Sequence, residues 1–428
     1  MKFNKQTTEK FSRRSFIKRT LAAAGSFFIV PRHVIAASGY PAPSDQLTKA
    51  VIGVGGMGQS HVRYSGARLL AVCDVDADHL TSTLAKVDPD VKGYHDFREV
   101  LERPDIDIVH IATPPHWHAL ISIAAAAAGK DIWCEKPMTR TIAEGQAVTA
   151  AVKKYDSIFR LNTWFRFEST FYGFETTVAP IKKIVMNRLL GWPLTVNVSR
   201  TTGFNWKFNW SGRTDLQPEW IPEVLDYDMW LGPAPYKPYH HHRVHQTFRG
   251  YWDYDGGGLG DMGQHYLDPV QYLLEKDETG PVAVEIDAPQ SHPDAVGSWR
   301  RITMYYADGC EIILDGEGGK GHIPFIEGPL GKLYPGLESN IPDLRRKLKS
   351  LPASPGQNTD FHACVRNRQK FALNESNAHR SASLVNLGKT ALRLGCNLKY
   401  DPLGQKFFDN PAANKLIHQP MRSPWKIG

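Results

Sequence analysis

Cysteine and long apolar runs are both scarce in this chain of 428 residues. Its five cysteines are widely spaced and include no C-x-x-C pair, which excludes the common zinc and dithiol motifs and argues against a disulfide framework. Cys73 and Cys134 fall within apolar strand patterns and are predicted to be buried free thiols. No apolar run is long enough to span a bilayer as a mature helix. The sequence therefore predicts no membrane anchoring.

Net charge is also absent once the first 37 residues are set aside. The whole chain carries a formal charge of +7. Residues 1–37 hold eight of its 51 basic residues and one of its 44 acidic residues, so the remainder has 43 of each. The charge of the remainder therefore gives no reason to expect a nucleic-acid partner.

Residues 1–37 have the organisation of an export signal. The run Ser-Arg-Arg-Ser-Phe-Ile-Lys at 12–18 is similar to a twin-arginine motif, an apolar stretch follows at 21–30, and Val34-Ile35-Ala36 offers small residues for cleavage. We expect a twin-arginine signal peptide, the twin-arginine export machinery as a partner, and a protein that is periplasmic or otherwise exported. The alternative is a disordered basic tail.

The most informative pattern in the sequence lies at residues 49–62, where a glycine turn joins an apolar strand to a helix. Gly53, Gly55 and Gly58 form the G-x-G-x-x-G spacing. Gly53 permits a tight turn, Gly55 lets a pyrophosphate approach the backbone, and Gly58 lets the helix pack close to the strand. The sequence predicts a dinucleotide site that also includes Gly56 and Met57, with an ordinary glycine turn as the alternative.

Asp74 gives the cofactor its predicted identity. It ends a second apolar strand, about where the ribose-binding acid of this unit belongs, ~20 residues after the glycine turn. A carboxylate there accepts hydrogen bonds from ribose hydroxyls and repels a 2′-phosphate, and no arginine follows it immediately. We therefore expect NAD, with NADP as the less favoured alternative.

Strands and helices alternate between residues 49 and 162, which predicts an α/β fold with a doubly wound parallel sheet, the Rossmann arrangement. Later segments at 194–202, 281–287, 299–307 and 310–314 read as strands, which indicates a second α/β domain with an open, mainly antiparallel sheet. We expect an irregular excursion at 316–358 and helices at 360–371 and 378–394. The expected domains are 38–165 and 166–395, followed by a loop-rich tail at 396–428 that packs back on the body.

Two further motifs carry chemistry. Glu135-Lys136-Pro137 ends the fifth strand pattern, at the edge of a parallel sheet that faces the ligand crevice. The glycine-rich turn at 256–260 leads into a helix pattern with Asp261 and His265 at i and i+4, on one face. A lysine and an acid–imidazole pair can orient a sugar hydroxyl and take its proton. The alternatives are a surface lysine, a capping aspartate and a structural histidine.

Taken in order, these motifs resemble those of the glucose–fructose oxidoreductase/inositol dehydrogenase superfamily (Gfo/Idh/MocA). The matching stretches are Gly53–Gly58, the Thr-Pro-Pro-His-Trp-His run at 113–118, Glu135-Lys136-Pro137, and Asp261 with His265. The stretches 395–402, 412–414 and 422–425 are similar to a bacterial branch of that family. The resemblance covers nearly the whole chain after residue 37 and implies a homo-oligomer, a dimer or tetramer, assembled through the open sheet.

The resemblance also implies roles for single residues. His265 is the expected general base, Asp261 positions the substrate or the base, and Lys136 assists proton transfer. Further cofactor contacts are expected from Thr113, Pro114, His118, Glu135, Lys136 and Arg166, and substrate contacts from Trp117, Asn162, Trp252 and Gln264. Trp206, Trp210 and Tyr251 are other aromatic residues that could stack on a sugar, or simply fill the core.

No metal site is predicted. His240, His241, His242 and His245 are close in sequence, but no acidic residue stands at ligand spacing beside them. Imidazoles on a solvated loop are the favoured reading.

The resemblance implies an NAD(P)-dependent oxidoreductase that takes hydride from a secondary hydroxyl of a sugar, glycoside or polyol. If the leader acts, the cofactor must be loaded before export and regenerated in the same site. The alternative is an NAD-dependent glycosidase that oxidises its substrate transiently, eliminates the aglycone and reduces again. A binding protein that has lost its chemistry is a third, less favoured class.

Overall fold

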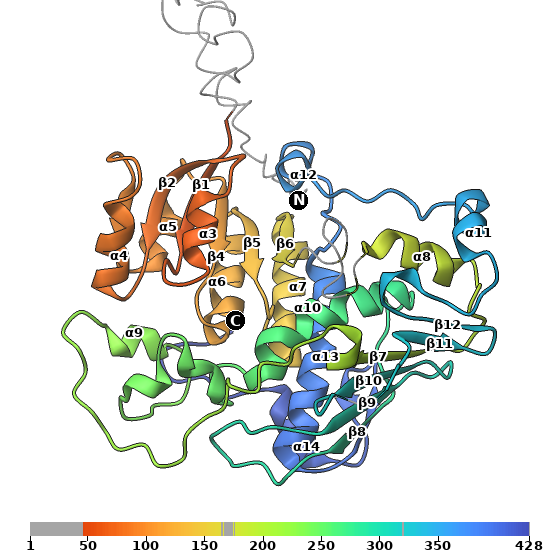
Figure 1. Cartoon of the computed structure of the whole chain (residues 1–428). Helices are drawn as coiled ribbons and strands as arrows, with labels where there is room; N and C mark the ends of the chain where they lie inside the picture. Colours follow the sequence, from red (N-terminus) through yellow and green to blue (C-terminus); the bar gives the residue numbers. More distant parts are fainter. Residues whose placement is uncertain (1–45, 164–165, 167–173, 175, 319–320, 428) are drawn as a thin grey trace, which may run out of the picture. The chain divides into compact units, whose positions relative to one another are not determined.

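The structure, a computed structural model, describes residues 46–163, 166, 174, 176–318 and 321–427. The predicted signal peptide at 1–37 lies outside the described residues. Within them, two sheets and the helices around them account for most of the fold (Figure 1).

The first sheet has six parallel strands in the order β3-β2-β1-β4-β5-β6. Alternate residues of β1 enter different buried clusters: Ala50 and Ile52 belong to one, and Val51 belongs to another. Both faces of the sheet are therefore covered, which explains its near-continuous apolar strands. The elements are β1 (Thr48–Ile52), α3 (Gly58–Arg63), β2 (Arg68–Cys73), α4 (Ala77–Leu84), β3 (Lys92–Tyr94), α5 (Phe97–Glu102), β4 (Ile108–Ile111), α6 (Pro115–Ala127), β5 (Asp131–Glu135), α7 (Ile142–Tyr155) and β6 (Phe159–Asn162).

The second sheet has eight strands in the order β12-β11-β7-β10-β9-β8-β13-β14. It is mixed, because β7 and β10 run parallel while the other pairs are antiparallel. Its strands are β7 (Thr195–Ser199), β8 (Ala283–Asp287), β9 (Arg301–Tyr305), β10 (Glu311–Asp315), β11 (Ile326–Gly328), β12 (Gly331–Leu333), β13 (Leu398–Asp401) and β14 (Lys406–Phe407). The helices of this half are α8 (Val178–Met186), α9 (Tyr227–Leu231), α10 (Gly257–Leu273), α11 (Leu344–Ser350), α12 (Phe361–Asn367), α13 (Glu375–Leu394) and α14 (Pro411–Ile417), with 3₁₀ turns at Arg200–Thr202, His241–Arg243, Thr247–Gly250 and Pro335–Leu337.

Helices α10 and α13 connect the two halves, and Figure 1 shows them between the sheets. Helix α13 contacts α7 of the first half and α10 and β8 of the second. Small residues allow the close approach, because a Cβ on Gly263 would lie 2.9 Å from Val385 and one on Gly388 would lie 3.0 Å from Leu259. The described residues from Leu47 onward cluster as one compact unit, so the two halves pack against each other.

Three segments differ from the sequence-based expectation. Strand β3 was not predicted. The stretch 316–358, expected to be irregular, contains β11, β12 and α11 in its described part. The tail, expected to be loop-rich, contributes β13, β14 and α14. Its end nevertheless packs back on the first half, where the Trp425 ring lies 4.7 Å from that of Trp117.

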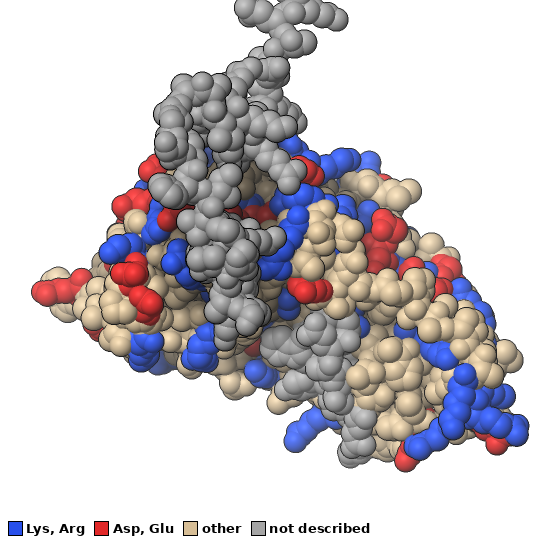
Figure 2. All heavy atoms as spheres, turned by 90° about the horizontal axis from the view of Figure 1, so that it is seen from above, with Lys and Arg blue, Asp and Glu red and all other residues tan. Residues whose placement is uncertain are grey.

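Basic and acidic side chains are interspersed over most of the face shown in Figure 2. All five cysteines are free thiols, and Cys73 and Cys134 are buried as predicted. Among the helices of the described residues, none is both long enough and apolar enough to cross a membrane.

Candidate functional site

A cavity of about 640 Å³ lies at the carboxyl ends of the parallel strands and is walled by residues of both halves. The strand order reverses between β1 and β4, which is where open α/β sheets bind their ligands. Its volume is that of a typical small-molecule or cofactor site. The predicted site residues that line it are Gly53, Gly55, Gly56, Met57, Asp74, Thr113, Pro114, Trp117, Glu135, Lys136, Asp261 and His265.

The glycine turn has the backbone geometry that a dinucleotide cradle needs. Gly53 has a φ of +83°, in the left-handed region, and a Cβ there would lie 2.7 Å from the backbone nitrogen of Thr113. A Cβ on Gly58 would lie only 1.9 Å from the carbonyl oxygen of Gly53. Gly58 does not line the cavity but lets α3 start against the strand. A Cβ on Gly56 would meet nothing within 4 Å, so this side of the turn is open.

Asp74 lies beside this turn at the end of β2. Its Oδ2 accepts a hydrogen bond from the amide of Val54 at 2.8 Å, and its Oδ1 accepts one from the amide of Asp76 at 3.0 Å. The imidazole of His79 approaches Oδ2 to 3.6 Å. The carboxylate is thus fixed at the cavity wall, next to the turn that would hold a pyrophosphate.

The loop after β4 forms the next part of the wall. Thr113 lines the cavity, and its hydroxyl oxygen is buried with no hydrogen-bond partner among the described residues. His118 lies behind it, with its two ring nitrogens at 2.8 Å from the carbonyl oxygen of Thr113 and 2.7 Å from that of Pro137. His118 therefore holds the loop in place and does not itself line the cavity. Burial lowers the pKa of its imidazole. The orphaned hydroxyl, the open glycine turn and the fixed carboxylate together fit a bound dinucleotide.

Lys136, Asp261 and His265 also line this cavity. The Nζ of Lys136 donates to Asp261 Oδ1 and to the Asp261 carbonyl oxygen, each at 2.9 Å. Arg249 donates from Nε to the same Oδ1 at 2.8 Å. The Nδ1 of His265 lies 3.0 Å from the hydroxyl of Thr163. A lysine, an aspartate and an imidazole are thus held in one place from two different halves of the chain.

The charges of this cluster fix the state of each group. Burial raises the pKa of Asp261, but the cationic Lys136 and Arg249 outweigh it and hold the pKa well below its ordinary value. Burial, reinforced by Lys136, lowers the pKa of His265 to about 3, so its ring is neutral at neutral pH. Asp255 also lines the cavity, and burial together with the Asp261 carboxylate raises its pKa to about 7.

Four other predicted residues do not line the cavity. Asn162 lies behind Glu135, to whose Oε1 it donates at 2.6 Å. Gln264 accepts from the amide of Met138 and donates to the carbonyl oxygen of Ala378. Trp252 is buried and donates its indole N–H to the carbonyl oxygen of His292. Arg166 is fully buried between the carboxylates of Asp268 and Asp277. These four residues support the structure around the cavity from outside its wall.

Glu135 also has a second partner from the glycine-turn helix. His61 on α3 places its Nε2 2.9 Å from Glu135 Oε1. Burial alone would raise the pKa of Glu135. The hydrogen bond and the charge of His61 lower it by more, so the net pKa lies below the ordinary range. The Glu-Lys-Pro turn is thereby tied to α3.

Sequence reasoning missed Arg249, Lys207 and Asp255, which line the cavity. Arg249 lies in a 3₁₀ turn that carries no recognised motif, and Asp255 directly precedes the glycine-rich turn, which was the one available signal. Trp210 lines the cavity, whereas Trp206, Tyr251 and Trp252 do not. The indole nitrogen of Trp210 has no hydrogen-bond partner among the described residues.

In the described part of the chain, two groups of histidine and acidic side chains lie close enough together to bind a metal ion. His240 and His241 lie beside Glu219, an acid that is distant in sequence and was therefore not considered as their partner. The second group joins Asp76, His79 and His245 at the cavity wall.

Acid should destabilise this fold through its buried imidazoles. Burial lowers the pKa of His116 and of His265 to about 3. Between pH 6.5 and 3 the unfolded chain therefore binds more protons than the folded one, so stability falls as the pH falls, by about 2 kcal/mol for each group at pH 5. We expect the Tm, measured by calorimetry, to drop between pH 7.5 and pH 5. The Tm of His116→Phe should drop less than that of the wild type between pH 7.5 and pH 5. Equal drops in Tm for the two proteins would contradict the role of His116.

Comparison with known proteins agrees with the geometry. A sequence model described as "Oxidoreductase family, NAD-binding Rossmann fold" matches residues 47–163, and one described as "Oxidoreductase family, C-terminal alpha/beta domain" matches residues 174–427. Both models belong to the Gfo/Idh/MocA group.

Individual relatives match over parts of their length. A levoglucosan dehydrogenase from Pseudarthrobacter phenanthrenivorans is 26% identical over 65% of this chain and 61% of its own length. An inositol 2-dehydrogenase from Salmonella typhimurium is 33% identical over 25% of this chain and 34% of its own. A glycosyl hydrolase family 109 protein from a Shewanella species is 38% identical over 23% of this chain and 25% of its own. The chain thus spans less than two thirds of each of these relatives.

The fold also matches solved structures. The WlbA dehydrogenase from Bordetella pertussis, solved in complex with NADH and UDP-GlcNAcA, superposes with a TM-score of 0.58 at 17% identity, over 83% of this chain and 98% of that one. An identity this low speaks for the fold alone. Because the two sequence models together cover nearly all of the chain after residue 46, the chain belongs to the Gfo/Idh/MocA oxidoreductase family.

Proposed function

We propose that this chain is an NAD-dependent dehydrogenase that oxidises a secondary hydroxyl of a sugar, glycoside or polyol. One observation carries the proposal: Lys136, Asp261 and His265 line the same cavity as the glycine turn and Asp74. Proton-transfer groups and a dinucleotide cradle in one cavity are what hydroxyl oxidation requires. The sugar and polyol dehydrogenases among the relatives support this substrate class.

Each polar residue then has a chemical task. His265, neutral because it is buried, accepts the proton of the substrate hydroxyl. Lys136 donates a hydrogen bond to the same oxygen, and Asp261, ionised between Lys136 and Arg249, keeps the lysine in position. A bound nicotinamide supplies the hydride acceptor. The ring of Trp210, which lines the cavity, offers a surface on which a sugar can stack.

The location and assembly of the protein are part of the proposal. The twin-arginine pattern at 12–18 supports export in folded form to the periplasm, with the cofactor already bound. We also propose a homodimer or homotetramer assembled through the outer face of the mixed sheet, where Glu285 of β8 and Arg301 of β9 are exposed.

A glycosidase that works through transient oxidation is the second candidate. The observation in its favour is the similarity to a glycosyl hydrolase family 109 protein. Asp255, a cavity carboxyl whose pKa is raised to about 7, offers a group able to protonate a leaving glycosidic oxygen at neutral pH.

One experiment separates the two candidates. The full chain is purified, loaded with NAD, and mixed with a panel of free sugars, polyols and aryl glycosides while absorbance is recorded in the reduced-nicotinamide band and in the aglycone band. Rising nicotinamide absorbance without aglycone release is the result expected for the dehydrogenase. Catalytic aglycone release without net reduction would replace it with the glycosidase, and failure to bind any nicotinamide would refute both.

Asp74 should control the choice of cofactor. In Asp74→Ala we expect the Kd for NAD to rise ~10- to 100-fold, because hydrogen bonds to a charged group are lost, and the preference for NAD over NADP to shrink. Asp78→Ala is the matched control, since Asp78 is exposed on the same loop and helix and does not line the cavity. Tryptophan-to-NADH energy transfer measures both affinities. A ratio of NAD to NADP affinity that is equal in the two variants would contradict the role of Asp74.

A further inference from the structure

The wall of the cavity beside Asp74 is built by both halves of the chain. The loop after β2 and the segment 224–226 form a two-way backbone bridge: Ala77 N–H donates to the Val224 carbonyl at 2.9 Å, and Asp226 N–H donates to the Val75 carbonyl at 3.0 Å. The Rossmann loop that carries the predicted ribose-binding acid is therefore joined directly to the second half.

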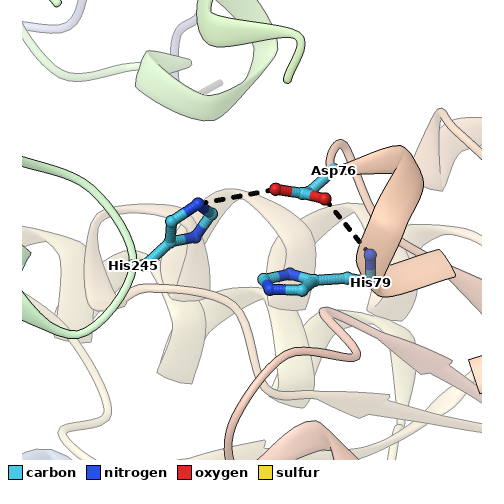
Figure 3. Close-up of side chains that lie close together, drawn as sticks. All are labelled: Asp76, His79 and His245. Carbon is cyan, nitrogen blue, oxygen red and sulfur yellow. Dashed lines mark hydrogen bonds and ion pairs between the residues drawn. The ribbon is translucent and has the colours of Figure 1, made fainter. Parts of the chain in front are cut away.

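Side chains strengthen this junction on two sides. His95 Nε2 lies 2.9 Å from Asp226 Oδ2. His245, from the second half, lies 3.4 Å from Asp76 Oδ2, and its ring meets the ring of His79 with the centroids 5.0 Å apart. Figure 3 shows Asp76 and His79 on one side of this contact and His245 reaching toward Asp76 from the other.

The position of His245 is unusual for its residue type. Its φ is +53°, in the left-handed region, which few residues other than glycine adopt. His245, Asp76 and His79 all line the cavity. A Cβ on Gly55 would lie 3.1 Å from the His79 ring, so this cluster directly adjoins the phosphate-binding turn.

We propose that His245 closes over the adenosine half of the bound dinucleotide and that the backbone bridge at 224–226 holds this closure, so that the cofactor leaves only when this junction between the two halves opens. The proposal rests on the NAD binding proposed above. It gives the chain a slowly exchanging, built-in cofactor, which an oxidoreductase outside the cytoplasm needs. The cofactor is then retained by contacts of His245 and the bridge at 224–226, in addition to its contacts with the Rossmann half.

A metal ion is the other occupant that Asp76, His79 and His245 would suit. The contacts favour closure over the cofactor instead. Asp76 Oδ1 already accepts from the amides of Asp78 and His79 as the cap of α4. The two imidazoles meet edge to face, which is the arrangement of an aromatic contact.

The first test measures how fast NADH leaves the full-length protein, by stopped-flow fluorescence after trapping with excess NAD. In His245→Ala we expect the release rate to rise at least ~10-fold, equivalent to a loss of ~1.4 kcal/mol. His241→Ala is the matched control, because His241 is exposed on the same loop and does not line the cavity. An unchanged release rate in His245→Ala would overturn the proposal. Equal acceleration of the wild type by EDTA would also overturn it, in favour of a cation site.

The second test locks the junction and does not depend on removing a side chain. Residues 77 and 224 flank the bridged pair Asp76 and Leu225 and share a backbone hydrogen bond of 2.9 Å, which puts their Cα atoms ~5.5 Å apart, within reach of a disulfide. Both are exposed, and the five native cysteines are free thiols, four of them buried. In Ala77→Cys/Val224→Cys, oxidation should slow NADH release at least ~10-fold and reduction should restore it. An NADH release rate that is the same in the oxidised and the reduced variant would refute the closure. A protein that binds no NADH, whether oxidised or reduced, would refute the proposed function itself.

Discussion

Lys136→Met should lower turnover ~10³-fold while changing the Kd for NADH by less than threefold. The substitution keeps the length of the stem but removes the ammonium group that donates to Asp261 at 2.9 Å from inside the cavity. Loss of a positioned proton-transfer group typically reduces a rate by 10² to 10⁴. The charge of Asp261 remains balanced by Arg249, so the fold should survive.

The matched control for this prediction is Lys86→Met, on the exposed end of the loop after α4 and outside the cavity. Turnover is measured with whichever sugar reduces bound NAD in the wild type, affinity by energy transfer to NADH, and folding by the Tm. If Lys136→Met turns over at the rate of Lys86→Met, the assignment of Lys136 is wrong. If it binds NADH poorly, Lys136 serves the cofactor more than the substrate.

Gly58→Ala should abolish cofactor binding and destabilise the protein by ~3 kcal/mol or more. The added Cβ would lie 1.9 Å from the Gly53 carbonyl oxygen, which is backbone and cannot rotate away. The start of α3 must therefore move off the turn, taking the amides that would face the phosphates with it. Thermal unfolding and NADH titration measure the two effects.

Gly56→Ala is the matched control in the same turn. A Cβ at Gly56 meets nothing within 4 Å, so we expect its stability to stay within ~0.5 kcal/mol of the wild type. Equal stability of the two variants would mean that the glycine turn is not as tightly constrained as these contacts require.

The Rossmann half was predictable because its signals are local. Apolar strand runs, the glycine spacing and Asp74 each depend on neighbours in sequence, and the parallel sheet follows from them. Strand β3 was missed because Lys92-Gly93-Tyr94 has no apolar pattern and becomes a strand through its pairing with β2. The hairpin of β11 and β12 was missed for a similar reason, since three-residue strands in a Gly- and Pro-rich stretch gain their order from β7.

The site was predictable where a motif fixes both position and direction. The Glu-Lys-Pro turn ends a buried strand, so Lys136 had to face the crevice. Trp252 lies in a turn and Gln264 on α10, close to motifs, but tertiary packing decides the direction of both side chains, and both point into the protein. Arg249 reaches Asp261 from a separate 3₁₀ turn, a contact that depends on tertiary structure.

A crystal structure of the full chain with NAD tests the central claim most directly. The account predicts density for the dinucleotide in the cavity, with the adenosine ribose at Asp74, the pyrophosphate over the turn Gly53–Gly58, and the nicotinamide beside Lys136 and His265. An empty cavity at saturating NAD, or a dinucleotide bound with its nicotinamide away from Lys136, would contradict the account.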